Sequence, residues 1–331
     1  METSFGDPVS EYTAAIEGAA VTDRSYVGRF RATGKDMLDL LNRLSSNKLE
    51  ELPPGTGKGT ILPTNKGRVI DLLHIFARDD HLLLLTSSQT RQRIAEWIDL
   101  YTFLEEAVLE DVTEASAMVA VLGPQAADLL QRALGAPASQ MEPYGSLAVS
   151  AGGHDVTLLR SDPLRAPGFD LVVAAEHAPK LWETLVAEGA VPIGEQTFDL
   201  LRIQEGVPRY DAEMSEELNP WEANLQEYIN FEKGCYIGQE VILRLNTYKK
   251  VQQRLMALAF SEGATVTAGD RLYQGEQEAG EVTSVAHRPT SGDLIGLGLV
   301  KRAFSTVETR LQAGDATVTV SELPLRVSVA G

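Results

Sequence analysis

The sequence predicts an α+β body followed by a small closed β-barrel. Up to Gly189, strand-like segments are interrupted by amphipathic helices, a pattern typical of an α+β sandwich. From Val251 onward the chain contains short strands between Gly, Asp and Glu turns, which favours a barrel. At 331 residues the chain is long enough for more than one core, because single cores stop growing near about 250–300 residues.

Strands in the body are indicated by short apolar or alternating runs bounded by turn residues. They are expected over residues 26–31, 64–76, 82–85 and 118–122, in a hairpin over 146–159, and over 168–173. In the barrel they are expected over residues 255–260, 271–273, 280–285, 294–300 and 316–320.

Helices in the body are indicated by apolar residues at helical spacing. The first contains Met37, Leu38, Leu41 and Leu44, and residues 33–36 fit a capping box for it. The others are expected over residues 88–107, 124–134 and 179–188. In the helix over 88–107 the apolar face is expected to include Ile94, Trp97, Ile98, Tyr101 and Leu104.

Composition excludes several classes of function. The formal net charge is −18, which argues against an extended nucleic-acid footprint because such a footprint requires a basic face. The five histidines show no metal-ligand spacing with one another or with the one cysteine, so no resident metal is expected. The longest apolar run, residues 82–85, is too short to span a membrane, and no signal peptide is expected because residues 1–8 are acidic and lack an apolar core. A reducing cytoplasm is the expected location, because one cysteine allows no internal disulfide.

The most informative stretch is residues 233–240, Lys-Gly-Cys-Tyr-Ile-Gly-Gln-Glu. Residues 239–245 favour a helix, so a helix N-terminus and the charge of Lys233 would both lie near Cys235 and favour its thiolate form. Cys235 and Lys233 are therefore the candidate catalytic residues. The alternative is that Cys235 is a small buried hydrophobic residue, as most free cysteines are.

This stretch resembles the signature of the YgfZ-type folate-binding proteins, relatives of the aminomethyltransferase (T protein) of the glycine cleavage system. Residues 202–208 and 219–225 resemble further, weaker motifs of the same family. The resemblance implies two interleaved ferredoxin-like halves with tetrahydrofolate, or a derivative, in a central channel. We expect a folate-binding body over residues 1–246 and the barrel over residues 247–331.

The resemblance also implies residues that hold the folate. Arg160 and Asp170 fall at the spacing of a family arginine and of a glutamate that holds the pterin, and a carboxylate suits the pterin because it accepts two parallel N–H bonds. Asp71 matches one member of a family Asp-Asp pair, but Leu72 replaces the other. Both aspartates have alternatives, since Asp71 could face solvent and Asp170 could be a half-buried strand residue.

Three more residues are implied as folate contacts. Arg202 belongs to a segment that shapes the channel in the relatives. Gln239 and Glu240 would orient the loop or a bound ligand rather than act on the sulfur.

Three classes of function follow. The first is a tetrahydrofolate-binding protein that assists iron–sulfur cluster assembly or repair in client enzymes, including tRNA-modifying enzymes; its partners would be a reduced folate and iron–sulfur client or assembly proteins. The second is a folate-dependent aminomethyltransferase or demethylase, which Asp71 supports and Leu72 opposes. The third is a scaffold that keeps the fold without the ligand. Whether the protein is an enzyme stays open.

Overall fold

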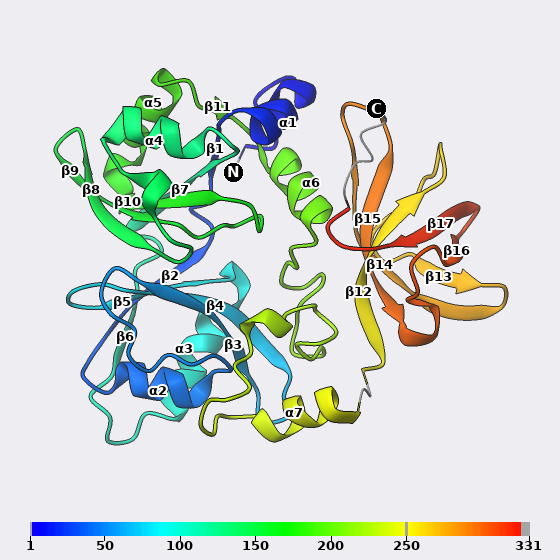
Figure 1. The fold of residues 1–331 in the computed structure, drawn as a ribbon, viewed down its shortest axis with the longest axis horizontal. Coiled ribbons are helices and arrows are strands. Elements are labelled where there is room, and N and C mark those ends of the chain that lie inside the picture. The colour runs from blue at the N-terminus through cyan, green and yellow to red at the C-terminus, as the bar shows by residue number, and fades with distance from the viewer. Residues whose placement is uncertain (1, 249–250, 326–331) are drawn as a thin grey trace. The chain divides into compact units, whose positions relative to one another are not determined.

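The computed structural model describes residues 2–248 and 251–325 (Figure 1). Its contacts divide the chain into two compact units. The first unit consists of Met1–Thr64, Ile70–Thr197 and Glu227–Ile237, and the second of Asn65–Val69, Phe198–Gln226 and Gly238–Gly331. The domain limits expected from the sequence, 1–246 and 247–331, stay a prediction.

A six-stranded sheet, sheet A, has the strand order β11-β1-β7-β10-β9-β8. β11 runs parallel to β1, and the other neighbours are antiparallel. The bounds are β1 Ala20–Asp23, β7 Ser116–Leu122, β8 Ser146–Ala151, β9 His154–Leu159, β10 Gly168–Ala174 and β11 Val191–Pro192.

A five-stranded sheet, sheet B, has the order β3-β4-β5-β2-β6. Its bounds are β2 Gly28–Thr33, β3 Gly57–Pro63, β4 Val69–Ala77, β5 Leu82–Thr86 and β6 Val108–Asp111. The chain leaves sheet A after β1, builds all of sheet B, and returns to sheet A at β7, so the two halves are interleaved as expected.

Two helices cover one face of each sheet: α4 and α5 lie on sheet A, and α2 and α3 lie on sheet B (Figure 1). α4 and α5 pack on sheet A through Leu129, Leu130, Leu181 and Leu185, while α2 and α3 form a second core with sheet B. Their bounds are α1 Pro8–Glu17, α2 Met37–Leu44, α3 Arg91–Leu100, α4 Ala126–Leu134, α5 Ala178–Ala187, α6 Glu195–Glu205 and α7 Gln239–Tyr248. Short 3-10 turns are η1 Ser88–Thr90, η2 Ala138–Gln140, η3 Ala175–His177, η4 Gln226–Tyr228 and η5 Arg302–Phe304.

Two local predictions about helices were wrong. The capping box before α2 does not form, because the Asp36 carboxylate accepts the backbone N–H of Glu106 (2.8 Å) instead. The helix expected over 88–107 starts as a 3-10 turn and ends at Leu100. As a result Leu104, expected on the buried face, is 96% exposed.

The inner faces of sheets A and B meet in a third apolar cluster. It contains Val27, Phe76, Leu83, Leu85, Met118 and Leu159. Since Phe76 comes from β4 and Met118 from β7, this cluster joins the two sheets and frames the polar groups described below.

The second unit contains a closed barrel with the strand order β12-β15-β14-β13-β16-β17. Its bounds are β12 Gln253–Phe260, β13 Arg271–Gln274, β14 Gln277–His287, β15 Leu294–Lys301, β16 Arg310–Ala313 and β17 Ala316–Ser321. β16 was missed from the sequence, as were β1, β3, β6 and β11 in the first unit. The α+β class with a C-terminal barrel is confirmed. No helix in the described ranges is long and apolar enough to cross a membrane.

Candidate functional site

A buried ion pair lies between the sheets of the first unit. Nη1 of Arg24, just after β1, donates to both carboxylate oxygens of Asp170 in β10 (2.8 and 2.7 Å). Asp170 is fully buried. Burial alone would lower the pKa of Arg24, but Asp170 and Tyr26 together raise it. The predicted pterin carboxylate is therefore buried, not half-buried, and pairs with a cation, Arg24, that no sequence motif indicated.

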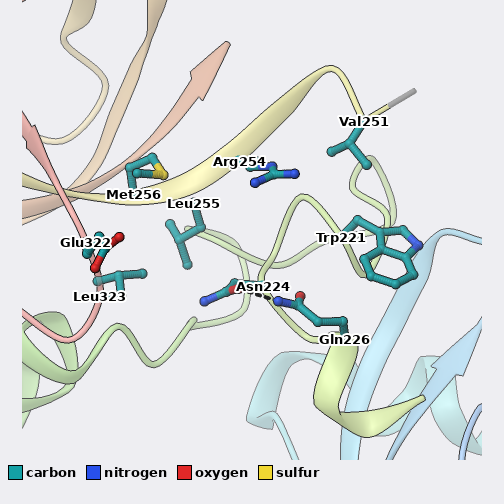
Figure 2. Close-up of a pocket in the computed structure, with 9 residues that line it drawn as sticks. All are labelled: Trp221, Asn224, Gln226, Val251, Arg254, Leu255, Met256, Glu322 and Leu323. Atoms are coloured by element: carbon teal, nitrogen blue, oxygen red, sulfur yellow. Dashed lines mark hydrogen bonds between the residues drawn. The ribbon is translucent and has the colours of Figure 1, made fainter. Parts of the chain in front are cut away.

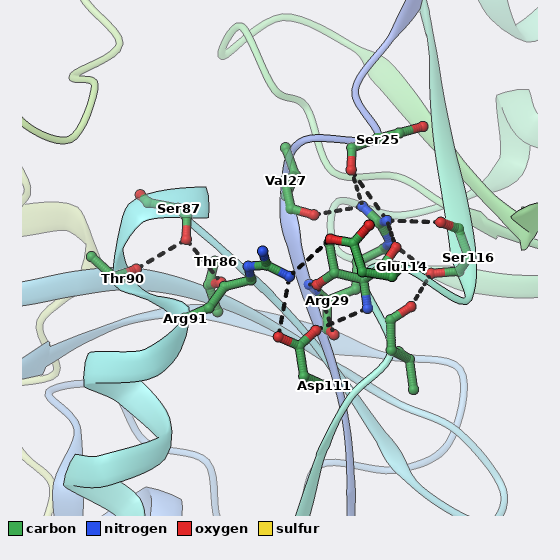
Figure 3. Close-up of polar contacts among 12 residues, drawn as sticks. Ser25, Val27, Arg29, Thr86, Ser87, Thr90, Arg91, Asp111, Glu114 and Ser116 are labelled. Carbon is green, nitrogen blue, oxygen red and sulfur yellow. Dashed lines mark hydrogen bonds and ion pairs between the residues drawn. The ribbon is translucent and has the colours of Figure 1, made fainter.

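The turn that follows Arg24 in the chain is fixed by a second arginine, Arg29, whose contacts are drawn in Figure 3. Arg29 is fully buried, and its guanidinium donates to carbonyl oxygens of Ser25 (3.2 Å), Val27 (2.5 Å) and Thr113 (2.5 Å). Its Nε donates to the Ser116 hydroxyl (2.8 Å). The Ser25–Val27 turn is thereby tied to the start of β7.

His74 in β4 lies near this ion pair on the inner side of sheet B. Its ring stacks on Tyr144 (5.7 Å between centroids) and meets Tyr228 edge-on (6.2 Å). Burial and the nearby Arg24 lower the pKa of His74 to about 4, so the ring is neutral at pH 7. Its Nδ1 is buried and has no hydrogen-bond partner within residues 2–248 and 251–325.

A cavity of about 360 Å³ adjoins the same two tyrosines. It is lined by Asn47, Lys58, Gly59, Tyr144, Ser161, Asp162, Arg165, Glu227 and Tyr228. The hydroxyl of Ser161 is buried without a partner among the residues described. A Cβ on Gly59 would lie 2.4 Å from the Tyr144 hydroxyl and 2.6 Å from the Tyr228 ring, so only glycine fits there.

The backbone of this cavity is strained in three places. Tyr144 (φ 62°), Asp162 (φ 45°) and Arg165 (φ 55°) all adopt left-handed conformations without being glycine. Such residues cluster at ligand sites because the surrounding structure must hold them there. Strain, an unpaired hydroxyl and stacked aromatic rings together mark this cavity as the candidate site.

Arg160, predicted to act with Asp170, lies nearby but has other partners. Asp170 pairs in register with Leu159, which places Arg160 just beyond it at the end of β9. The Arg160 guanidinium contacts Asp162 (3.5 Å) and the carbonyl oxygen of Met141, while its own carbonyl accepts the N–H of Tyr144 (2.9 Å). The structure thus brings Arg160 and Asp170 together on neighbouring strands and assigns the cation of the buried pair to Arg24.

Asp71 is buried at the corner between β4 and α3, not solvent-facing. It accepts hydrogen bonds from Leu72 N–H (2.9 Å), Ser87 N–H and hydroxyl (both 2.8 Å) and the Thr90 hydroxyl (2.6 Å). Burial raises the pKa of Asp71 to about 6 in spite of these donors. Because neighbouring strand residues point to opposite faces, the replaced position, Leu72, lies on the same face as His74.

The two candidate catalytic residues have different surroundings. Lys233 is buried, and its Nζ donates to the carbonyl oxygens of Asn42 (2.6 Å), Ser45 (2.7 Å) and Asn47 (2.7 Å) around the C-terminal end of α2. Burial lowers the pKa of Lys233 to about 8. Cys235 is exposed, so the alternative of a buried cysteine is wrong.

Three predicted residues belong to the second unit. Arg202 is buried and donates to Asp199 (2.6 Å), Glu213 (2.9 Å) and the Ser284 hydroxyl (2.6 Å). Gln239 and Glu240 begin α7, which starts after Gly238 (φ 76°) as expected. Glu240 pairs with Arg244 one turn later (2.6 Å).

The second unit also has a pocket of about 330 Å³ (Figure 2). It is lined by Trp221, Asn224, Gln226, Val251, Arg254, Leu255, Met256, Glu322 and Leu323. None of the predicted site residues is among them. Across the described parts of both units, no three His, Cys, Asp or Glu side chains are grouped so that they could hold a metal ion.

Comparisons with known proteins agree with this architecture. The GCVT N-terminal domain matches residues 3–233, and the glycine cleavage T-protein C-terminal barrel domain matches residues 253–325. A chloroplastic protein of Arabidopsis thaliana is 31% identical to this chain, over 97% of this chain and 74% of its own length. That protein is named provisionally as a transferase. The aminomethyltransferase of Thermosynechococcus vestitus is 26% identical over 98% of this chain and 88% of its own.

A solved structure has the same fold. The glycine cleavage system aminomethyltransferase T of Bartonella henselae superposes with a TM-score of 0.86 at 20% identity, covering 96% of this chain and 89% of that one. The two domain matches and the 31% identical relative span nearly the whole sequence. This chain therefore belongs to the glycine cleavage T-protein family, with the family's N-terminal domain and its C-terminal barrel.

Proposed function

We propose that this protein binds a reduced folate, tetrahydrofolate or a derivative, between the two sheets of its first unit. The observation that carries the proposal is His74, a neutral ring with an unpartnered buried nitrogen beside the stacked Tyr144 and the Arg24–Asp170 pair. A pterin is a flat ring system edged with N–H groups and acceptors, so aromatic walls and a free ring nitrogen suit it.

The residues of this chain fit that ligand by their chemistry. His74 and the Ser161 hydroxyl have unused hydrogen-bonding capacity, and both lie at or next to the aromatic cavity. Asp170 would hold the ring edge directly only if it shared its oxygens with Arg24, because each oxygen already accepts one bond. A bound folate would supply one-carbon chemistry; the residues bind and orient it and exclude water from its ring.

Within the family we propose the YgfZ-type role, assistance to iron–sulfur cluster assembly or repair in client enzymes, including those that modify tRNA. The exposed Cys235 in Lys-Gly-Cys-Tyr-Ile-Gly-Gln-Glu supports this role, because an accessible thiolate can exchange disulfides or serve as one transient cluster ligand. Iron–sulfur client or assembly proteins would supply the other ligands. An exposed free thiol also suits the reducing cytoplasm that we infer as the location.

The second candidate is a folate-dependent aminomethyl transfer or demethylation. It is favoured by the names of the relatives, several of which are aminomethyltransferases. Against it, Leu72 removes a carboxylate from the face that carries His74, and Asp71 uses its oxygens to hold the start of α3. Steady turnover of a glycine-cleavage intermediate by the purified protein would favour this candidate over the first.

Calorimetric titration with tetrahydrofolate tests the binding site. His74→Phe keeps the ring stack and removes both ring nitrogens, so affinity is expected to fall about tenfold, the loss of one hydrogen bond. Val307→Phe, at an exposed position of the second unit, is the control and should leave affinity unchanged. Absence of binding by the native protein would refute the folate proposal.

A cellular assay tests the role of the thiol. In a strain that depends on this protein, Cys235→Ser should fail to restore the activity of iron–sulfur enzymes while its folate affinity stays native. Full restoration by Cys235→Ser would remove the thiol from the mechanism and leave folate binding standing.

A further inference from the structure

The loop between α3 and β6 exposes an unusual amount of apolar surface. Leu100 is 56% exposed, Phe103 80%, Leu104 96% and Val108 62%, all within nine consecutive residues, 100–108. Isolated exposed apolar residues are normal, but a contiguous group of large ones usually marks an interaction site. We call residues 100–108 the apolar loop.

The apolar loop is held in this conformation by specific bonds. One oxygen atom of the Glu105 carboxylate accepts the backbone N–H groups of Phe103 (2.9 Å) and Leu104 (3.1 Å), and the other pairs with Arg43 (2.8 Å). These hydrogen bonds lower the pKa of Glu105 to about 2, and the bond from Arg43 has the largest effect. Asp36 fixes the next residue by accepting the N–H of Glu106. The apolar side chains therefore point outward from an ordered backbone.

The apolar loop leads directly into an edge strand. β6 is the last strand in the order of sheet B and pairs with β2 alone among the described strands. An edge strand presents unpaired backbone N–H and C=O groups that another extended chain can pair with. Apolar anchors beside a free edge give both the affinity and the hydrogen-bonding template for strand addition.

The surroundings of this surface are acidic. The segment from α3 to the start of β7 contains no Lys or Arg after Arg93, and its acidic residues are Glu96, Asp99, Glu105, Glu106, Glu110, Asp111 and Glu114. Arg43, Lys35 and Arg91 neutralise part of this charge. Arg31 lies opposite Glu110 on β2 but pairs with Asp80 (2.8 Å), and Asp99 and Glu110 have no ion-pair partner in the described residues. A basic partner is favoured, because complementary charge steers association and selects against wrong partners.

A second copy of this chain fits poorly. Two β6 strands paired antiparallel over their full length would place Asp111 of each copy diagonally across from Glu110 of the other, and like charges on neighbouring positions of paired strands are destabilising. The net charge of −18 adds general repulsion between copies.

We propose that the apolar loop and the β6 edge form a docking surface for an extended segment of a partner protein that combines apolar and basic residues. The segment adds a strand beside β6, its apolar side chains cover Phe103 and Leu104, and its cations face Glu110 and Asp99. With a four-residue edge strand the interface is small, so binding is transient. This inference does not depend on folate binding.

The probe is a short capped peptide that alternates lysine and valine. Hydrogen exchange followed residue by residue should show slower exchange of the amides in Val108–Asp111 when the peptide binds, and affinity should fall with added salt. The double variant Phe103→Ser, Leu104→Ser should bind about tenfold more weakly or worse, as expected when central apolar anchors are removed. Its melting temperature should be native, because both side chains are exposed.

Matched controls separate this site from general adhesion. Val307→Ser, an exposed valine of the second unit, should bind the peptide like the native protein. A peptide with N-methyl groups on its pairing amides, and one with glutamate in place of lysine, should both lose binding. Native affinity in the double variant, or equal binding of the N-methylated peptide, would overturn the proposal. So would a native dimer in sedimentation that the double variant breaks, because a second copy would then cover the surface.

Discussion

Two sets of buried polar groups in the first unit differ in whether their hydrogen bonds are complete. At the corner between β4 and α3, Asp71 receives four hydrogen bonds from neighbouring backbone and hydroxyl groups. Between the sheets, His74 Nδ1 and Ser161 Oγ have no partner in the described residues. Nearly all buried polar groups in native proteins have hydrogen-bond partners. A group whose hydrogen bonds are all made within the protein therefore has a structural role, whereas a group that lacks a partner has capacity to bind a ligand.

The Arg24–Asp170 pair lies beside the incomplete set but is itself paired. If this ion pair mainly stabilises the fold, Asp170→Ala should lower the free energy of unfolding by about 3–5 kcal/mol, because the substitution leaves a buried arginine without its counter-charge. Replacing both residues, Arg24→Met with Asp170→Leu, should recover most of this loss. Urea denaturation measures both; a small loss in Asp170→Ala would show that the pair contributes little to stability.

The pH dependence of stability tests the Asp71 corner. The folded pKa of Asp71 is raised to about 6, and an unfolded aspartate titrates near 3.9. Its contribution to stability is thus fully present below about pH 4 and is lost as the pH rises through about 6. Relative to Asp71→Asn, the native protein should gain roughly 2–3 kcal/mol between pH 7 and pH 4. Parallel stability curves for the two proteins would show that folding does not raise the pKa of Asp71.

The smallest expected effects on stability concern residues 233–240. There the buried, hydrogen-bonded Lys233 and the exposed Cys235 lie two positions apart. Lys233→Met should cost about 1–3 kcal/mol, because three carbonyl oxygens at the end of α2 lose their donor. Cys235→Ala should change stability by no more than about 0.5 kcal/mol, as for other exposed positions. Thermal denaturation of the two variants compares them directly. A large loss in Cys235→Ala would place the thiol among the structural groups.

The candidate site could be predicted only in part. Asp170 and Arg160 were predicted through the family resemblance, because they fall at the spacing of two family residues, and Cys235 through its flanking glycines and charge. Arg24 carried no local signal, because it lies 146 positions before its partner. His74 was visible as a histidine in an apolar strand, but nothing in the strand pattern shows that its ring nitrogen lacks a partner.

The sequence by itself determined the α+β class, most of the longer strands, the barrel and the helix after Gly238, because these depend on periodicity and turn residues within a few positions. It did not mark β1, β3, β6, β11 and β16, or the helices α1 and α6. Only the tertiary structure decided that Lys233 supports α2 and that Asp71 accepts hydrogen bonds at the start of α3. Both depend on partners distant in the chain that packing brings together. Local patterns specify which face of an element is apolar, but the competition among distant donors and acceptors for each buried charge is settled only when the elements meet.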